Sequence, residues 1–169
     1  QGRVVGIVAG SPKTILENLN LPHGLTVNQG KLYVAETNRV AEYDYNPISF
    51  TAKFNRKLTD LPIGSGHFTR SLLLLDNNTL LVSVGSSCNV CIESDKRRAA
   101  ILKIDLGSGQ TTTFAQGLRN SVFMAQYNHE IWATEMGRDL LGDDLPPDEI
   151  NIIEAGKNYG WPNCYGKQT

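Results

Sequence analysis

The order of apolar and polar positions along this chain is that of short β-strands joined by tight turns. Three stretches share one plan: an apolar strand, a short turn, and a second strand of apolar and β-branched residues. The turns, rich in Asn, Asp or Gly, fall at Asn28–Gly30, Asp76–Asn78 and Tyr127–Glu130. Apolar stripes at helical spacing are nearly absent. The pattern therefore predicts an all-β fold.

The three hairpins recur about every 50 residues, which is the period of a propeller blade. Matching apolar triplets begin at Leu32, Leu80 and Ile131. A further strand follows each hairpin, and two more are predicted near Arg3–Gly10 and at Gln110–Gly117. A β-sandwich would show the same strand density without this self-similarity. We expect one partial β-propeller domain over 1–169, with about three four-stranded blades at approximately 1–60, 61–117 and 118–169.

The length raises a problem for a closed ring. Closed propellers have about 4–8 blades, whereas 169 residues supply about three. An incomplete ring leaves the faces of its terminal sheets exposed, which is a liability in water. We therefore expect either a piece of a longer protein or a homo-oligomer whose copies complete the propeller.

Composition and charge exclude some classes of partner. Apolar residues make up 40% of the chain, and 16 basic and 17 acidic residues give a net charge of -1. This balance offers no electrostatic reason to bind nucleic acid or an anionic membrane. No stretch approaches the roughly 20 apolar residues of a membrane helix, and no signal peptide is visible at the start. We expect no nucleic-acid partner and no membrane insertion.

The three cysteines leave several readings open. Our leading interpretation is a disulfide between Cys88 and Cys91 in an oxidising compartment. Two reduced thiols are the alternative, and a zinc site would need further ligands, whereas the histidines are scattered. A thioredoxin-type role is disfavoured because no helix pattern follows the pair. The state of Cys164 is left open.

A series of motifs resembles one known family. The motifs are "GHFTRSL", "LLVSVGSS", "RRAAILKID", "GLRN", "DDLPPDEIN" and "NYGWPNCYG", in that order between about Leu21 and Gly166. Together they resemble the soluble glucose/sorbosone dehydrogenases, and their sorbosone-dehydrogenase-like branch best. Those enzymes are six-bladed β-propellers that oxidise sugars with pyrroloquinoline quinone (PQQ) and calcium. The resemblance implies a small aldose- or sorbosone-type substrate and a periplasmic or secreted location.

The resemblance also implies roles for residues near the cofactor. His67 matches the general base, a role that suits an imidazole at neutral pH. Arg119 and Asn120 match a pair that faces cofactor and substrate, where a fixed guanidinium suits a quinone that becomes anionic on reduction. Arg70 is a candidate cofactor contact or a charge at a strand start. The alternative for His67 is a solvated loop position. The alternative for Arg119 is that it only donates hydrogen bonds to carbonyls in a turn.

The calcium ligands follow from the same resemblance. Gly137 and Arg138 match a loop whose carbonyls hold the ion, which is consistent with the preference of calcium for oxygen. Glu149 and Tyr159 match a further calcium region, although Tyr159 could simply pack a blade corner. Asp139–Asp144 lengthens the loop relative to glucose-oxidising members. A solvated acidic loop is the alternative for this cluster.

The expected function is accordingly a sugar dehydrogenase with an incomplete pocket. The family's cofactor pocket is ringed by all its blades, and the basic residues of later blades have no counterpart after Thr169. Two alternatives stay open: a non-catalytic propeller module that binds a sugar or a protein, and a half-propeller that folds by self-association.

Overall fold

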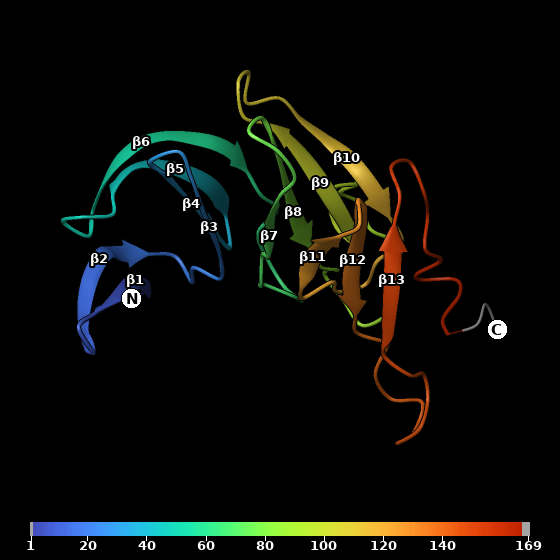
Figure 1. Cartoon of the computed structure of the whole chain (residues 1–169). Coiled ribbons are helices and arrows are strands. Elements are labelled where there is room, and N and C mark those ends of the chain that lie inside the picture. Colours follow the sequence, from blue (N-terminus) through green and yellow to red (C-terminus); the bar gives the residue numbers. More distant parts are fainter. Residues whose placement is uncertain (1, 167–169) are drawn as a thin grey trace.

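A computed structural model describes residues 2–166, which form 13 strands in four antiparallel sheets and no helix. The sheets follow one another along an arc in chain order, like part of a fan (Figure 1). The all-β prediction is confirmed. Within residues 2–166 there is no helix of the length and apolarity that crossing a bilayer requires.

Each sheet is built from strands that are consecutive in the chain. The first sheet pairs β1 (Gly2–Val8) with β2 (Ser11–Leu19). The second has the order β3 (Gly24–Asn28), β4 (Lys31–Glu36), β5 (Arg39–Asn46) and β6 (Thr51–Asp60). The third has the order β7 (Leu72–Leu74), β8 (Thr79–Val84), β9 (Ala100–Asp105) and β10 (Thr111–Gln116). The fourth has the order β11 (Met124–Tyr127), β12 (Glu130–Glu135) and β13 (Glu149–Ile153).

The predicted turns set the register of the first strand pair in three sheets. Gln29 and Gly30 both have positive φ, at 46° and 74°, as do Asn128 and His129, at 48° and 66°. Two consecutive residues of this kind make the tight turn whose twist matches that of paired strands. In the remaining turn, between β7 and β8, the side chain of Asp76 accepts the backbone N–H of Asn78. The three predicted hairpins are therefore present.

The central strands bury both of their faces, which explains their unbroken apolar runs. Leu80, Val82 and Val84 of β8 face the second sheet, in a cluster that includes Tyr33. Leu81 of the same strand faces the fourth sheet. This alternation is the two-residue period of a strand held between two layers. Burying one such leucine stabilises the fold by about 1.5–3 kcal/mol.

The strand pattern missed two strands, β2 and β6. Both are mostly exposed and carry charges such as Lys13, Glu17 and Lys53, so they lack the apolar run that identifies a buried strand. The predicted segment 1–60 consequently contains two sheets, because β1 and β2 pair with each other and pack Val4 and Leu19 against the second sheet. The other two segments contain one sheet each.

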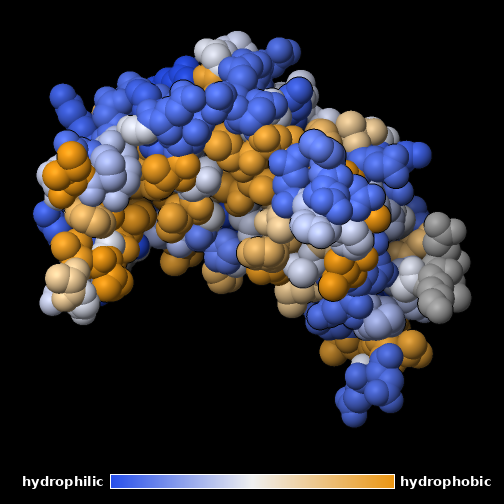
Figure 2. All heavy atoms as spheres, in the orientation of Figure 1, coloured by the Kyte–Doolittle hydropathy of each residue, from blue (hydrophilic) through white to orange (hydrophobic). Residues whose placement is uncertain are grey.

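Apolar side chains remain exposed along the fan and at its two ends. Figure 2 shows apolar residues gathered along the concave side of the arc. At the first end Ile7 of β1 is 67% exposed, and at the last end Ile150 of β13 is 70% exposed. Such faces are normally covered by protein.

Candidate functional site

The candidate residues lie on loops at one end of the third and fourth sheets. His67 precedes β7, Ser86 follows β8 and Arg119 follows β10. In an antiparallel sheet the start of the first strand and the ends of the second and fourth strands share an edge. This topology brings together residues that are far apart in the sequence.

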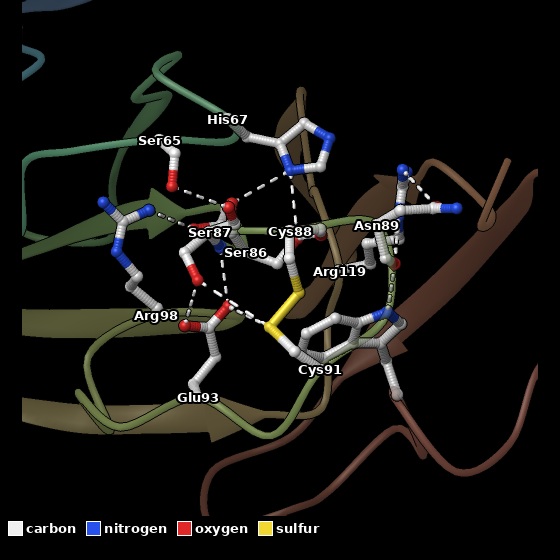
Figure 3. The surroundings of a disulfide bond; sticks show 12 residues. Ser65, His67, Ser86, Ser87, Cys88, Asn89, Cys91, Glu93, Arg98 and Arg119 are labelled. Atoms are coloured by element: carbon white, nitrogen blue, oxygen red, sulfur yellow. Dashed lines mark hydrogen bonds between the residues drawn. A yellow bond between two sulfur atoms is a disulfide. The ribbon is translucent and has the colours of Figure 1, made fainter.

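Ser86 joins His67 to Arg119. The backbone N–H of Ser86 donates to the Arg119 carbonyl at 2.7 Å, and the Ser86 carbonyl accepts the His67 backbone N–H at 2.9 Å. The His67 ring turns Nδ1 toward Ser86, 3.1 Å from its carbonyl oxygen and 3.0 Å from Oγ (Figure 3). Ser86 was not among the residues predicted from the sequence.

These contacts determine the tautomer of His67. The Ser86 hydroxyl donates to the Cys88 carbonyl at 2.7 Å, so toward the ring its Oγ is an acceptor, like the Ser86 carbonyl. Nδ1 must therefore carry the hydrogen, and we assign the lone pair to Nε2. Nε2 points away from Ser86 (Figure 3). A neutral imidazole in this state can take a proton at Nε2.

The surroundings of His67 favour the neutral ring. Burial lowers its pKa below the ordinary value of 6.5, and the positive charge of Arg119 lowers it further. The Ser86 backbone hydrogen bond and Asp139 act in the opposite direction, and Arg70 adds to the lowering. At neutral pH the side chain is therefore available as a base.

Arg119 is 3% exposed, and protein groups surround its guanidinium. Nη1 donates to the Gly137 carbonyl at 2.6 Å and to the Met136 carbonyl at 3.4 Å. Nη2 donates to Asp139 at 2.5 Å and to the Asn89 side-chain oxygen at 3.0 Å, and Nε donates to the Asn89 carbonyl at 3.1 Å. Arg119 thus binds the loop after β12 to the loop after β8.

Asn120 is buried beside His67. A Cβ added at Gly85 would lie 2.6 Å from Asn120 Oδ1 and 2.6 Å from His67 Cβ, so only glycine lets the three approach this closely. The backbone N–H of Asn120 donates to Glu135 Oε1 at 2.8 Å, and the hydroxyl of Ser121 donates to Oε2 at 2.8 Å. Glu135 therefore holds the chain where it leaves Arg119.

Glu135 is a buried acid that sequence reasoning missed. Burial is the main cause that raises its pKa from 4.5 to about 7, and the charge of Glu149 adds to this. It ends β12 as Glu36 ends β4, and Glu36 is 1% exposed. A charged residue at the end of an apolar strand, in the same place of two repeats, is the signal that could have identified both.

The predicted calcium residues border one cleft with Arg119 and Glu135. The N–H of Gly137 donates to Asp148 at 3.0 Å, and Glu149 accepts the Gly166 N–H at 2.7 Å. The cleft is lined by Gly137, Arg138, Glu149, Tyr159, Trp161 and other residues of the same loops. His67, Arg70 and Asn120 are not among its lining residues.

Two of the predicted residues are engaged within the protein. The hydroxyl of Tyr159 donates to the Ile152 carbonyl at 2.7 Å and accepts the Glu154 N–H at 2.8 Å, as in a packed blade corner. Arg70 is 1% exposed and donates to the carbonyls of His67, Thr69 and Pro62. Burial, and then the nearby charge of Arg98, lower its pKa to about 10. Arg70 braces the His67 loop from behind.

The cysteine interpretation is confirmed, because Cys88 and Cys91 form a disulfide with a Cα–Cα distance of 6.1 Å. Cys164 is free and exposed. The crosslinked turn lies between His67, Arg119 and Glu93 (Figure 3). Beside this turn, Arg98 is buried and donates to the Gly85 carbonyl at 3.4 Å.

The chain is similar to proteins of about twice its length. An uncharacterized protein of Borreliella burgdorferi is 32% identical over 171 residues, covering 91% of this chain and 44% of that protein. A family AA12 carbohydrate-active enzyme of Trichoderma reesei is 27% identical with a TM-score of 0.80, covering 96% of this chain and 50% of that one. The PQQ domain of a Coprinopsis cinerea pyranose dehydrogenase is 20% identical with a TM-score of 0.83, covering 95% and 49%.

These similarities settle the fold and the family. They confirm the predicted β-propeller architecture, and the chain spans about half the length of the relatives it matches. The predicted likeness to sugar-oxidising propellers extends to the family AA12 carbohydrate-active enzyme, and the PQQ domain of the pyranose dehydrogenase shares the fold. A family model described as TrAA12-like matches residues 4–168. Since that match covers nearly the whole sequence, the chain belongs to the TrAA12-like family.

Proposed function

We propose that this chain forms about half of a PQQ- and calcium-dependent dehydrogenase that oxidises an aldose- or sorbosone-type sugar. The observation that carries the proposal is the link through Ser86, which holds a neutral His67 beside the buried cation Arg119. The similarity to a pyranose dehydrogenase PQQ domain agrees with it. The disulfide supports a periplasmic or secreted location.

His67 would act as the general base on the sugar. Its Nδ1–H is bound to Ser86, so Nε2 is the atom that would take the proton of the sugar hydroxyl. As the ring becomes charged, the Ser86 carbonyl still accepts from Nδ1 and steadies the imidazolium. Positioned base catalysis of this kind contributes about 100- to 10,000-fold in rate.

The residues present fit part of a site for the quinone and calcium. Arg138 Nε is buried without a hydrogen-bond partner among the described residues, so it can donate to an anionic group. The Gly137 carbonyl and the carboxylates of Glu135 and Glu149 are hard oxygen ligands around one cleft. When bound, the quinone would accept the electrons of sugar oxidation. Arg119 would supply a fixed positive charge close to the base.

We further propose that additional blades cover the exposed terminal faces, and that a second copy supplies them when this chain stands alone. The exposed Ile7 and Ile150 at the two ends support this. Sedimentation should then give a dimer, and Ile7→Glu with Ile150→Glu should give a monomer. A monomeric wild-type chain would contradict the self-association.

The function is tested by titrating the protein with PQQ and calcium while following the quinone absorption, and then measuring dye-linked sugar oxidation. His67→Ala should keep quinone binding and lose at least about 100-fold in oxidation rate. The control is His129→Ala, because His129 lies in the exposed turn between β11 and β12. Sugar binding without quinone binding would favour a non-catalytic module, and an active His67→Ala variant would refute the assignment of the base.

A further inference from the structure

The turn closed by the disulfide places one side chain, Asn89, between the two halves of the candidate site. Asn89 lies directly after Cys88, in the long connection from β8 to β9. That connection contains no strand, and the crosslink closes a ring of only a few residues around Asn89. The position of Asn89 therefore depends on the disulfide and on the contacts of the turn.

Asn89 uses its backbone carbonyl and both side-chain atoms. The carbonyl accepts Arg119 Nε at 3.1 Å and the Trp161 indole N–H at 3.3 Å. Oδ1 accepts Arg119 Nη2 at 3.0 Å and the backbone N–H of Asp139 at 2.8 Å. Nδ2 donates to the Asp139 carbonyl at 3.0 Å.

The side chain of Asn89 binds the backbone of Asp139 in the way that a neighbouring β-strand would. The amide of Asn89 meets both the N–H and the C=O of Asp139, a residue 50 positions away. Asp139 and Gly137 in turn both accept Arg119. Asn89 thus links the loop after β12 to the guanidinium of Arg119 in one hydrogen-bond network.

The same turn is also connected to His67. The Cys88 carbonyl accepts the Ser86 hydroxyl at 2.7 Å, and this hydroxyl oxygen faces His67 Nδ1. Cys88 and Asn89 are adjacent in the crosslinked turn (Figure 3). Cys88 therefore contacts Ser86, which holds His67, while Asn89 contacts Arg119.

We propose that Asn89 is a positioning residue that sets Arg119 and the 136–139 loop relative to His67, and that the Cys88–Cys91 disulfide holds it in place. Its consequence for catalysis rests on the function proposed above, but the positioning itself does not. A misplacement of a charged group by about 1 Å can cost on the order of 100-fold in rate.

The positioning is tested by residue-resolved amide hydrogen exchange on the protein without cofactor. In Asn89→Ala the Asp139 amide loses its acceptor and should exchange about fivefold faster or more. Asn89→Asp keeps the acceptor for the Asp139 N–H but turns an oxygen toward the Asp139 carbonyl, so it should restore only part of the wild-type protection. Asn77→Ala is the matched control, because Asn77 is exposed and its side chain accepts a hydrogen bond from Asn28, away from the candidate site. Cys88→Ser with Cys91→Ser should reproduce the effect of Asn89→Ala.

Unchanged Asp139 exchange in Asn89→Ala would overturn the inference, and unchanged exchange in the double serine variant would overturn the role of the disulfide. The rate of PQQ-dependent oxidation separates the two proposals. If the wild type does not oxidise sugars but Asn89→Ala still releases Asp139, the proposed function fails and the positioning stands. If the wild type is active and Asn89→Ala keeps its kcat, the consequence of this positioning for catalysis fails and the proposed function stands.

Discussion

Replacing Glu135 with Gln tests whether the buried acid behind Arg119 opposes folding when it ionises. Glu135 is 8% exposed, and its pKa rises from 4.5 to about 7, chiefly through burial. At about 1.4 kcal/mol for each tenfold change in proton affinity, this rise corresponds to roughly 3 kcal/mol. Hydrogen bonds from Asn120 and Ser121 offset part of the cost of burial, since they act to lower the pKa.

The direction of the change in unfolding free energy with pH depends on whether the folded or the unfolded chain binds the Glu135 proton more tightly. Below about pH 4.5 both the folded and unfolded chains carry a protonated Glu135. Between pH 4.5 and about 7 the unfolded chain loses the proton first, so the free energy of unfolding falls with rising pH. Above that range the loss is complete, at roughly 3 kcal/mol. Glu135→Gln has no such titration, so its stability relative to wild type should rise by about that amount from pH 4.5 to 8.

Urea unfolding across this pH range, in the presence of a chelator, provides the measurement. Any constant cost of replacing a carboxylate oxygen by an amide cancels in the comparison between pH values. Glu36→Gln is the matched control from the equivalent strand end, where Arg39 lies 2.5 Å from the carboxylate. It should lower stability at neutral pH, because it removes a partner of Arg39. A difference between Glu135→Gln and wild type that stays the same at both pH values would refute the reasoning.

Three further outcomes follow from the packing and charges. Gly85→Ala should cost about 1–3 kcal/mol and shift the His67 resonances in an NMR spectrum, since its Cβ would overlap His67 and Asn120; unchanged spectra would contradict this. Leu80→Ala should lower the free energy of unfolding by about 2–5 kcal/mol in a urea titration, because Leu80 is 0% exposed, and a loss well below that range would mean that the core collapses around it. Arg119→Gln should raise the NMR-measured pKa of His67, since the Arg119 charge lowers it; an unchanged or lower pKa would contradict this.

The fold was predictable where local chemistry and burial agree. The hairpin turns require residues that tolerate positive φ, and Gly30 and Asn128 supply them. Strands such as β8 and β9 are buried on both faces, so their apolar runs stand out. β2 and β6 were not predicted, because exposed strands at the edge of a sheet carry charged residues and their sequences resemble those of loops.

The site was predictable only in part, because its supports are tertiary contacts. The motifs singled out His67, Arg119 and Asn120 as candidates, and the topology brings these three to one end of the sheets. Nothing local identifies Asn89 as the partner of Asp139, since the two are 50 residues apart and polar loop residues are common. Arg70 was a candidate cofactor contact, but it donates to backbone carbonyls of His67 and Pro62. A sequence does not distinguish an arginine that faces a ligand from one that bonds carbonyls inside the protein.

The contacts of Arg119 explain how it could act without moving. A guanidinium has five N–H donors, and in Arg119 each nitrogen is engaged by Asn89, by the Met136 and Gly137 carbonyls, or by Asp139. It therefore has little freedom to swing toward a ligand, and its contribution is a fixed charge near His67. The Gly137 carbonyl that it binds has a second lone pair, so this oxygen can bind Arg119 and a metal ion together. Positive charge that is fixed in advance costs no reorganisation during a reaction, which is the condition under which electrostatic stabilisation is most effective.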